Sequence, residues 1–151
     1  MKEKHADRLE SIKEAHKSTK TDYSRIEDYL EVISELVDLK GYANTLDISR
    51  YLNVSAPSVT KMLQKLGDGG YLDYEKYRGI NLTQKGISLA CAVRQKHGTL
   101  LEFFKLLGID HEIANQDIEG IEHHLNPQTI TQLHKFVIFL KSNPKLLENF
   151  Q

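Results

Sequence analysis

Residues 45–82 read TLDISRYLNVSAPSVTKMLQKLGDGGYLDYEKYRGINL. Apolar residues at helical spacing predict two short helices in the first part of this stretch, separated by a tight turn at Asn53. Thr45 and Ser55 are suited to cap these helices, and Pro57 falls in a first turn, where a missing N–H costs little. Two short helices joined by a tight turn are typical of a helix-turn-helix motif.

A β-hairpin is predicted directly after the second helix. Residues 71–75 and 80–82 have the composition of two short strands, and residues 76–79 supply a turn that ends in glycine. A hairpin in this position is a wing, so the stretch predicts a winged helix-turn-helix domain.

The outward face of the second helix and the wing carry side chains suited to DNA. Hydroxyl and amide groups at the start of a recognition helix can read base edges, and lysine or arginine can contact phosphates. The candidate DNA contacts are Ser55, Pro57, Ser58, Thr60, Lys61, Gln64, Lys65, Lys76 and Arg78. The alternative is a solvated helix face and hairpin. With a wing directly behind the helix, we favour double-stranded operator DNA as the partner.

The rest of the chain is predicted to be helical, giving a mostly α fold with one small β-hairpin. A long helix from Thr83 to about Leu107 joins the two halves, and further helices begin at Asp110 and Pro127. The helices after Asp110 carry more apolar residues than a half of this size can bury alone, which predicts a homodimer. We expect a charged extension (residues 1–21), a winged helix-turn-helix domain (22–92) and an all-helical metal-binding and dimerisation domain (93–151).

The composition narrows the class of protein. The chain has 151 residues, a formal net charge of −1 and 40% hydrophobic residues, with no basic surplus of the kind that constitutive nucleic-acid binders carry. No apolar run approaches the ~20 residues that span a bilayer. The single cysteine, Cys91, excludes an intramolecular disulfide and a thiolate zinc cluster. We therefore expect a cytoplasmic protein without a membrane partner.

Acidic residues and histidines recur at ligand spacing in three places. Two acids lie three residues apart on the first helix, a triplet of two acids and a histidine follows the Asp110 position, and one histidine lies on the long helix. The candidate metal ligands are Asp28, Glu31, His97, Glu119, Glu122 and His123.

This set of ligands favours a hard divalent cation. Four carboxylates on one surface repel one another, and a cation removes that cost. Oxygen and imidazole ligands without a thiolate suit manganese or iron(II). Six such groups exceed the needs of one six-coordinate ion that also binds water, so two ions per protomer are expected. Each acid pair taken alone is more often a solvated face.

Three segments together resemble a known family. GYANTLDISRYLNVSAPSVTKMLQKL (41–66), YLDYEKYRGINLTQKG (71–86) and DIEGIEHHL (117–125) resemble the manganese transport regulators of the diphtheria-toxin-repressor family. The resemblance covers roughly residues 22–142. It implies a homodimer with N-terminal winged-helix domains, a two-ion Mn²⁺ site between the domains, and repression of manganese-uptake genes when metal is abundant.

The resemblance also assigns the ligand positions. The family's ligands fall on the same six residues, each of the type expected of the manganese branch. Iron-responsive relatives carry methionine at the place of Asp28 and cysteine at the place of Glu119, and neither is present here. The resemblance therefore favours manganese over iron.

Two rival functions are open. A winged-helix repressor that senses iron(II) or a small molecule would fit the N-terminal half. A two-metal carboxylate enzyme would use a Glu-x-x-His pair on each of two helices. Residues 119–123 (EGIEH) fit such a pair only superficially and occur once, and no nucleophile is readable. We expect a regulator, neither an enzyme nor a binder of a small-molecule substrate.

Overall fold

The computed structural model describes residues 8, 9, 11, 22–75 and 79–150. The predicted extension (1–21) therefore lies almost entirely outside the described residues. The elements in chain order are α2 (Asp22–Lys40), α3 (Thr45–Leu52), α4 (Ala56–Asp68), β1 (Leu72–Glu75), β2 (Gly79–Leu82), α5 (Gln84–Leu106), α6 (His111–Ile121), the 3₁₀ helix η1 (Glu122–His124), α7 (Pro127–Ser142) and α8 (Lys145–Glu148). The mostly helical fold with one hairpin is confirmed.

The helix-turn-helix forms through the predicted turn, with one change of cap. Asn53 adopts a left-handed conformation (φ +52°) between α3 and α4. The Ser55 hydroxyl accepts a hydrogen bond from the Ser58 amide and so caps α4. The prediction that Thr45 caps α3 is wrong, because Asn44 Oδ1 accepts from the Asp47 amide instead. An Asx side chain one residue earlier provides the same acceptor.

The wing is a two-stranded antiparallel hairpin, with Leu72 opposite Leu82. Thr83 caps α5 by accepting from the Gly86 amide, and its hydroxyl donates to the Gly70 carbonyl. Gly86 lies so close to the backbone that a Cβ there would be 2.0 Å from the Tyr71 carbonyl oxygen. The first turn of α5 is therefore fixed against the base of the wing.

The N-terminal half has a continuous hydrophobic core. It is formed by α2, α3, α4, the wing and the start of α5, and its fully buried members include Leu30, Ile33, Ile48, Val59, Leu63 and Ala90. Because α5 contributes Ala90 to this core and then continues past it, the helix fixes the position of the second half relative to the first.

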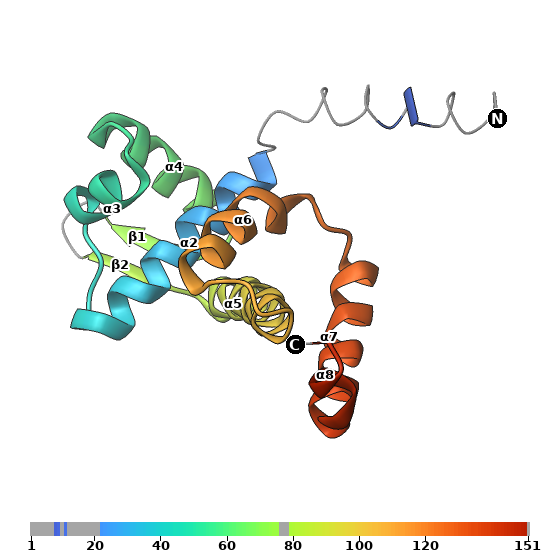
Figure 1. Cartoon of the computed structure of the whole chain (residues 1–151). Helices are drawn as coiled ribbons and strands as arrows, with labels where there is room; N and C mark the ends of the chain where they lie inside the picture. The colour runs from blue at the N-terminus through green and yellow to red at the C-terminus, as the bar shows by residue number, and fades with distance from the viewer. Residues whose placement is uncertain (1–7, 10, 12–21, 76–78, 151) are drawn as a thin grey trace.

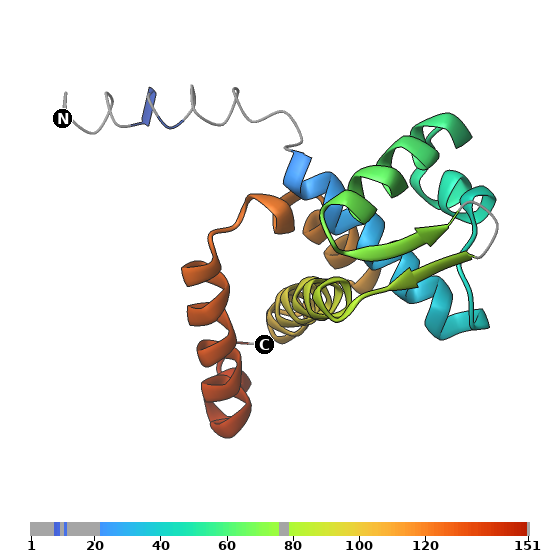
Figure 2. The same cartoon turned by 180° about the vertical axis from the view of Figure 1, so that it is seen from behind.

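The C-terminal half extends along α5. α6 packs on α5 beside α2, and α7 lies on the side of α5 away from the winged helix, as the two opposite views agree (Figures 1 and 2). The short α8 was not expected from the sequence. Within the described ranges, no helix combines the length and the hydropathy needed to cross a bilayer.

Candidate metal centre and DNA-reading helix

Four elements converge on the predicted ligands. α2 carries Asp28 and Glu31, α5 carries His97, α6 carries Glu119, and η1 carries Glu122 and His123, which lie beside one another in sequence. α2 and α6 both pack against α5, so residues nearly 100 positions apart in sequence meet in one place.

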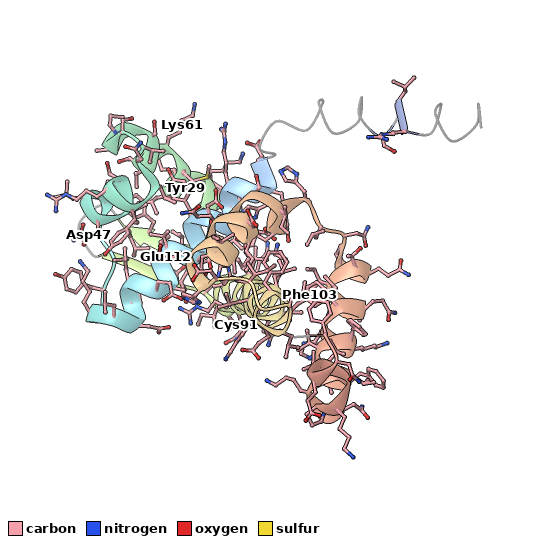
Figure 3. All side chains as sticks on the ribbon, in the orientation of Figure 1. Tyr29, Asp47, Lys61, Cys91, Phe103 and Glu112 are labelled. Carbon is pink, nitrogen blue, oxygen red and sulfur yellow. The ribbon has the colours of Figure 1, made fainter. Side chains whose placement is uncertain are left out.

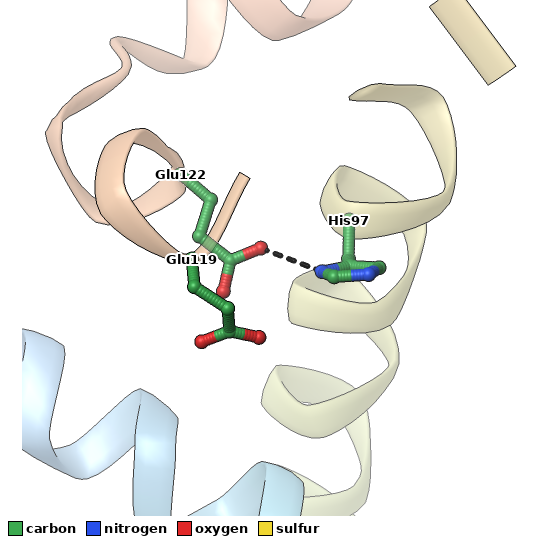
Figure 4. A group of neighbouring side chains, drawn as sticks. All are labelled: His97, Glu119 and Glu122. Carbon is green, nitrogen blue, oxygen red and sulfur yellow. Dashed lines mark hydrogen bonds and ion pairs between the residues drawn. The ribbon is translucent and has the colours of Figure 1, made fainter. Parts of the chain in front are cut away.

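One group of ligand atoms gathers around His97. Ligand atoms of His97, Glu119 and Glu122 lie within 4.8 Å of one another. His97 Nδ1 is 3.0 Å from Glu122 Oε2, and Figure 4 shows the Glu122 carboxylate reaching toward the imidazole with the Glu119 carboxylate next to it. This group could hold a metal ion through one nitrogen and two carboxylate ligands.

A second group gathers around His123. His123 Nε2 lies 2.7 Å from Asp28 Oδ1 and 3.5 Å from Glu122 Oε1. The other ring nitrogen, Nδ1, lies 2.7 Å from Glu27 Oε2. Glu122 therefore faces both groups, with one carboxylate oxygen toward each imidazole.

Two of the three ligands predicted near the end of α6 lie past the end of the α-helix. The α-helix ends at Ile121 and the chain continues as a 3₁₀ turn over Glu122–His124. The tighter turn changes the side-chain directions. His123 lies against Asp28 and Glu27 of α2, and Glu122 lies between His97 and His123.

Burial and neighbouring charges shift the pKa values in the centre. Burial, together with the charges of Glu122 and Glu119, raises the pKa of the Glu31 carboxyl to about 7. Hydrogen bonds to Asp28 and Glu27 raise the pKa of the His123 imidazole to about 10. Burial also raises the pKa of Glu122. The carboxylates thus repel one another, as expected of a site that a cation completes.

The residues fit a divalent cation. The Glu122 side chain is fully buried, and its Oε1 accepts no hydrogen bond from the described residues. A buried carboxylate oxygen that accepts no hydrogen bond costs free energy, which a cation ligand offsets. The surrounding donors are carboxylate oxygens and imidazole nitrogens, which suit hard or borderline divalent ions.

Three further residues contact the centre but were not predicted. Glu27 bonds to His123 and to Lys96 Nζ, which is 3.0 Å away. Asn115 Oδ1 lies 3.3 Å from His97 Nε2. Glu27 and Lys96 each precede a predicted ligand by one position, but that adjacency alone does not indicate which way a helical side chain points.

The α4 face predicted to read DNA is mostly free of protein contacts. Its exposed predicted members are Ser55, Pro57, Ser58, Lys61, Gln64 and Lys65. Lys61 projects from α4 into solvent (Figure 3). Thr60 is half-buried, and its hydroxyl donates to the Ala56 carbonyl. Individual DNA contacts stay predictions.

Two of the predicted phosphate contacts, Lys76 and Arg78, lie outside the described residues. A third, Lys65, forms an ion pair with Asp22 at the start of α2, with 2.8 Å between Nζ and Oδ2. In the protein without DNA, Asp22 of α2 therefore pairs with a lysine of α4 that is predicted to contact a DNA phosphate.

Two family models together match almost the whole described chain. "Iron dependent repressor, N-terminal DNA binding domain" matches residues 23–80, and "Iron dependent repressor, metal binding and dimerisation domain" matches residues 83–150. The predicted boundary between residues 92 and 93 falls inside α5 and stays a prediction.

Individual relatives agree with the family models. The chain is 43% identical over 126 residues to the HTH-type transcriptional regulator MntR of Lysinibacillus sphaericus, covering 83% of this chain and 91% of the relative. It is also 43% identical over 123 residues to the regulator of the same name from Listeria welshimeri, covering 82% and 87%. Both relatives are regulators by name, not enzymes.

Solved structures confirm the architecture. The structure of the manganese regulator SloR is similar with a TM-score of 0.65 and 30% identity, covering 76% of this chain and 54% of that one. The chain thus spans about half the length of this solved relative. Both family matches and the curated relatives lead to one conclusion: the chain belongs to the iron-dependent repressor family and is a metal-dependent transcriptional repressor, with an N-terminal DNA-binding domain and a C-terminal metal-binding and dimerisation domain.

Proposed function

We propose that the chain is a manganese-activated repressor that binds operator DNA tightly only when the centre between α2, α5 and α6–η1 holds Mn²⁺. One observation carries this proposal. The buried Glu122 carboxylate faces one imidazole with Oε2, while its Oε1 accepts no hydrogen bond from the described residues. A bound cation would complete the coordination of that carboxylate.

The chemistry of the donors favours manganese within a family named for iron. The predicted ligands are four carboxylates and two imidazoles, with no sulfur atom among them. Hard oxygen donors suit manganese, whereas thioether and thiolate ligands would select softer ions. The similarity to the structure of the manganese regulator SloR supports the same choice. The genes under control are then proposed to be those for manganese uptake, in the cytoplasm where the DNA lies.

Two ions per protomer are proposed from the same geometry. Glu31, His97, Glu119 and Glu122 would hold one ion. Asp28, His123 and the other oxygen of Glu122 would hold the second. The 3.0 Å and 3.5 Å separations of the two Glu122 oxygens from different imidazoles support a shared carboxylate.

α2 is the element through which the centre would act on DNA binding. Its middle carries Asp28 and Glu31, and its first residue pairs with Lys65 on the reading helix. Arg94 on α5 already binds α2 without metal, through Glu35 at 2.8 Å and Asp38 at 2.7 Å. His123 of η1 also contacts α2 without metal, through Glu27 and Asp28. A bound cation would add a second link, between the carboxylates of α2 and those of α6 and η1.

Bound metal supplies the positive charge that offsets repulsion among the carboxylates. With that repulsion removed, Asp28 and Glu31 of α2 can stay close to Glu119 and Glu122. This would restrict how the DNA-binding half, including α4, is oriented relative to the dimerisation half. A dimer binds an operator only when both reading helices match half-sites about one helical turn apart, so this restriction favours the binding state. Coupling of about 1–3 kcal/mol, or about 5- to 150-fold in affinity, is usual.

The test is a DNA titration by fluorescence anisotropy at fixed salt. The duplex is obtained by selecting random-sequence DNA on the wild-type protein in manganese. Wild type is compared in manganese, iron(II), zinc and chelator. Glu122→Ala removes the buried ligand, and Glu112→Ala, which removes an exposed acid of α6, is the matched control.

We expect tight binding in manganese, lost in chelator and in Glu122→Ala but kept in Glu112→Ala. Tighter binding in iron(II) than in manganese would transfer the assignment to iron. Equal binding in manganese and in chelator would leave a repressor that responds to something other than metal.

A further inference from the structure

We propose that Glu27 and Lys96 are positioning residues for His123: Glu27 fixes the imidazole ring, and Lys96 fixes Glu27. This role rests on the proposed metal centre, in which His123 is a ligand. Neither residue belongs to the set of six ligands, and the roles of the two differ from each other.

The contacts form a chain of three side chains from three elements. His123 Nδ1 of η1 lies 2.7 Å from Glu27 Oε2 of α2, and Lys96 Nζ of α5 lies 3.0 Å from the same oxygen. All three side chains are largely buried, with exposures of 7%, 9% and 15% for His123, Glu27 and Lys96. Short bonds in a buried setting restrict the rotation of each group.

The consequence for His123 is a defined ring orientation. With Nδ1–H donated to Glu27, the other nitrogen, Nε2, faces Asp28 at 2.7 Å and Glu122 at 3.5 Å. Metal-binding histidines commonly donate their second N–H to a carboxylate, which fixes the tautomer and makes the ring a better ligand. Glu27 supplies that carboxylate from the opposite side of the ring.

Lys96 explains why Glu27 is not itself a ligand. A carboxylate beside this acidic centre would otherwise add to the repulsion, and a buried charge without a partner is costly. The Lys96 ammonium neutralises Glu27 and holds its oxygen toward His123. α5 thus contributes a ligand, His97, and next to it an anchor for a ligand carried by another element.

Asp38 provides a matched control. Its carboxylate pairs with Arg94 at 2.7 Å and so also joins α2 to α5, but neither residue contacts His123 in the described structure. Asp38→Asn removes an α2–α5 ion pair without touching the imidazole. It separates loss of helix docking from loss of ring positioning.

The first measurement is manganese affinity, read from the electron paramagnetic resonance signal of free Mn²⁺. Loss of an outer partner of a metal-bound histidine typically weakens binding about 10- to 100-fold. We expect that loss in Glu27→Ala and in Lys96→Met. Glu27→Gln, which keeps an acceptor oxygen, should recover part of it, and Asp38→Asn should stay within about threefold of wild type.

The second measurement reads the ring directly, by nitrogen NMR of histidine-labelled protein loaded with Cd²⁺. In wild type and Asp38→Asn, His123 should bind through Nε2 and keep a proton on Nδ1. In Glu27→Ala this pattern should be lost or mixed. Melting temperatures in chelator show whether each variant still folds, and Lys96→Met replaces Glu27→Ala should that variant unfold.

Wild-type affinity and ring pattern in both Glu27→Ala and Lys96→Met would overturn the proposal. An equal loss in Asp38→Asn would assign the effect to helix docking and also overturn it. If wild type binds neither Mn²⁺ nor Cd²⁺, the proposed function itself fails, which the wild-type titration alone establishes.

Discussion

The N-terminal half holds most of the buried apolar side chains of the described chain, although it also exposes Leu39, Leu46 and Tyr51. The core of the N-terminal half, between residues 29 and 90, is continuous, and many of its members have no exposed surface. On α6 and α7, by contrast, Ile113, Phe136, Ile138 and Phe139 are 47–54% exposed. One half completes its core within a single chain, and the other presents an apolar face suited to the second copy of a dimerisation domain.

The largest effect is expected from Leu63→Ala in the N-terminal core. Leu63 is 0% exposed within the core cluster. Truncating a buried leucine usually costs about 2–5 kcal/mol, because contacts are lost and a cavity remains. Urea unfolding of the metal-free protein should show this loss at every protein concentration. A loss below about 1 kcal/mol would mean that this core tolerates cavities far better than usual.

The next effect concerns α5, which passes from one half to the other. In Gly86→Ala the new Cβ would meet the Tyr71 carbonyl oxygen at 2.0 Å, so backbone must move. Overpacking of this kind costs about 1–3 kcal/mol. Gly98→Ala on the same helix is the control, since a Cβ there meets nothing within 4 Å. It should stabilise the helix by about 0.5–1 kcal/mol. Similar melting temperatures for the two variants would contradict the close contact.

Features that depend on residues close together in the chain could be predicted from the sequence. Ser55, Thr83 and Asp110 mark helix starts by local chemistry, and the structure confirms all three as caps. The hairpin was equally local. The six candidate ligands were chosen from acids and histidines at helical spacing and from the resemblance. The four elements bring them near one another, and their binding of metal stays a prediction.

Long-range and geometric features were not predictable. The contacts of Glu27 with Lys96 and with His123 join residues 69 and 96 positions apart, and depend on how α2 packs against α5 and η1. The change from α-helix to 3₁₀ turn at Glu122 could not be predicted from the spacing of the ligand residues either. Both conformations accept the same residues over a single turn.

A smaller effect is expected on the exposed C-terminal face. Phe103 and Phe136 lie with ring centroids 6.3 Å apart, and Phe136 stacks with Phe139 at 6.4 Å. Phe139→Ser should weaken the dimer about tenfold, close to 1.4 kcal/mol, by removing apolar area that only a partner covers. Sedimentation of metal-free protein over a dilution series measures this change.

The control lies in the other half. Leu39 on α2 is 77% exposed, yet belongs to the DNA-binding half, so Leu39→Ser should leave the dimer unchanged. If both substitutions left the dimer intact, the partner would have to cover a different surface of the C-terminal domain. If both weakened it, the self-sufficiency of the N-terminal half would be wrong.

The smallest effect is expected at the exposed ion pair between Asp22 and Lys65. The side chains are 73% and 47% exposed, and exposed pairs are weak. Asp22→Asn frees Lys65 and removes a negative charge beside the reading helix. DNA affinity in manganese should rise about two- to fivefold at low salt, with a steeper dependence on salt as one more phosphate is neutralised. Asp117→Asn removes the same charge from α6, a helix that packs on α5, and should leave both affinity and salt dependence unchanged. An equal rise in the two variants would assign the effect to net charge. A fall in Asp22→Asn would instead make Asp22 a support of the reading helix, so that α2 aids DNA binding by holding Lys65 and not by releasing it.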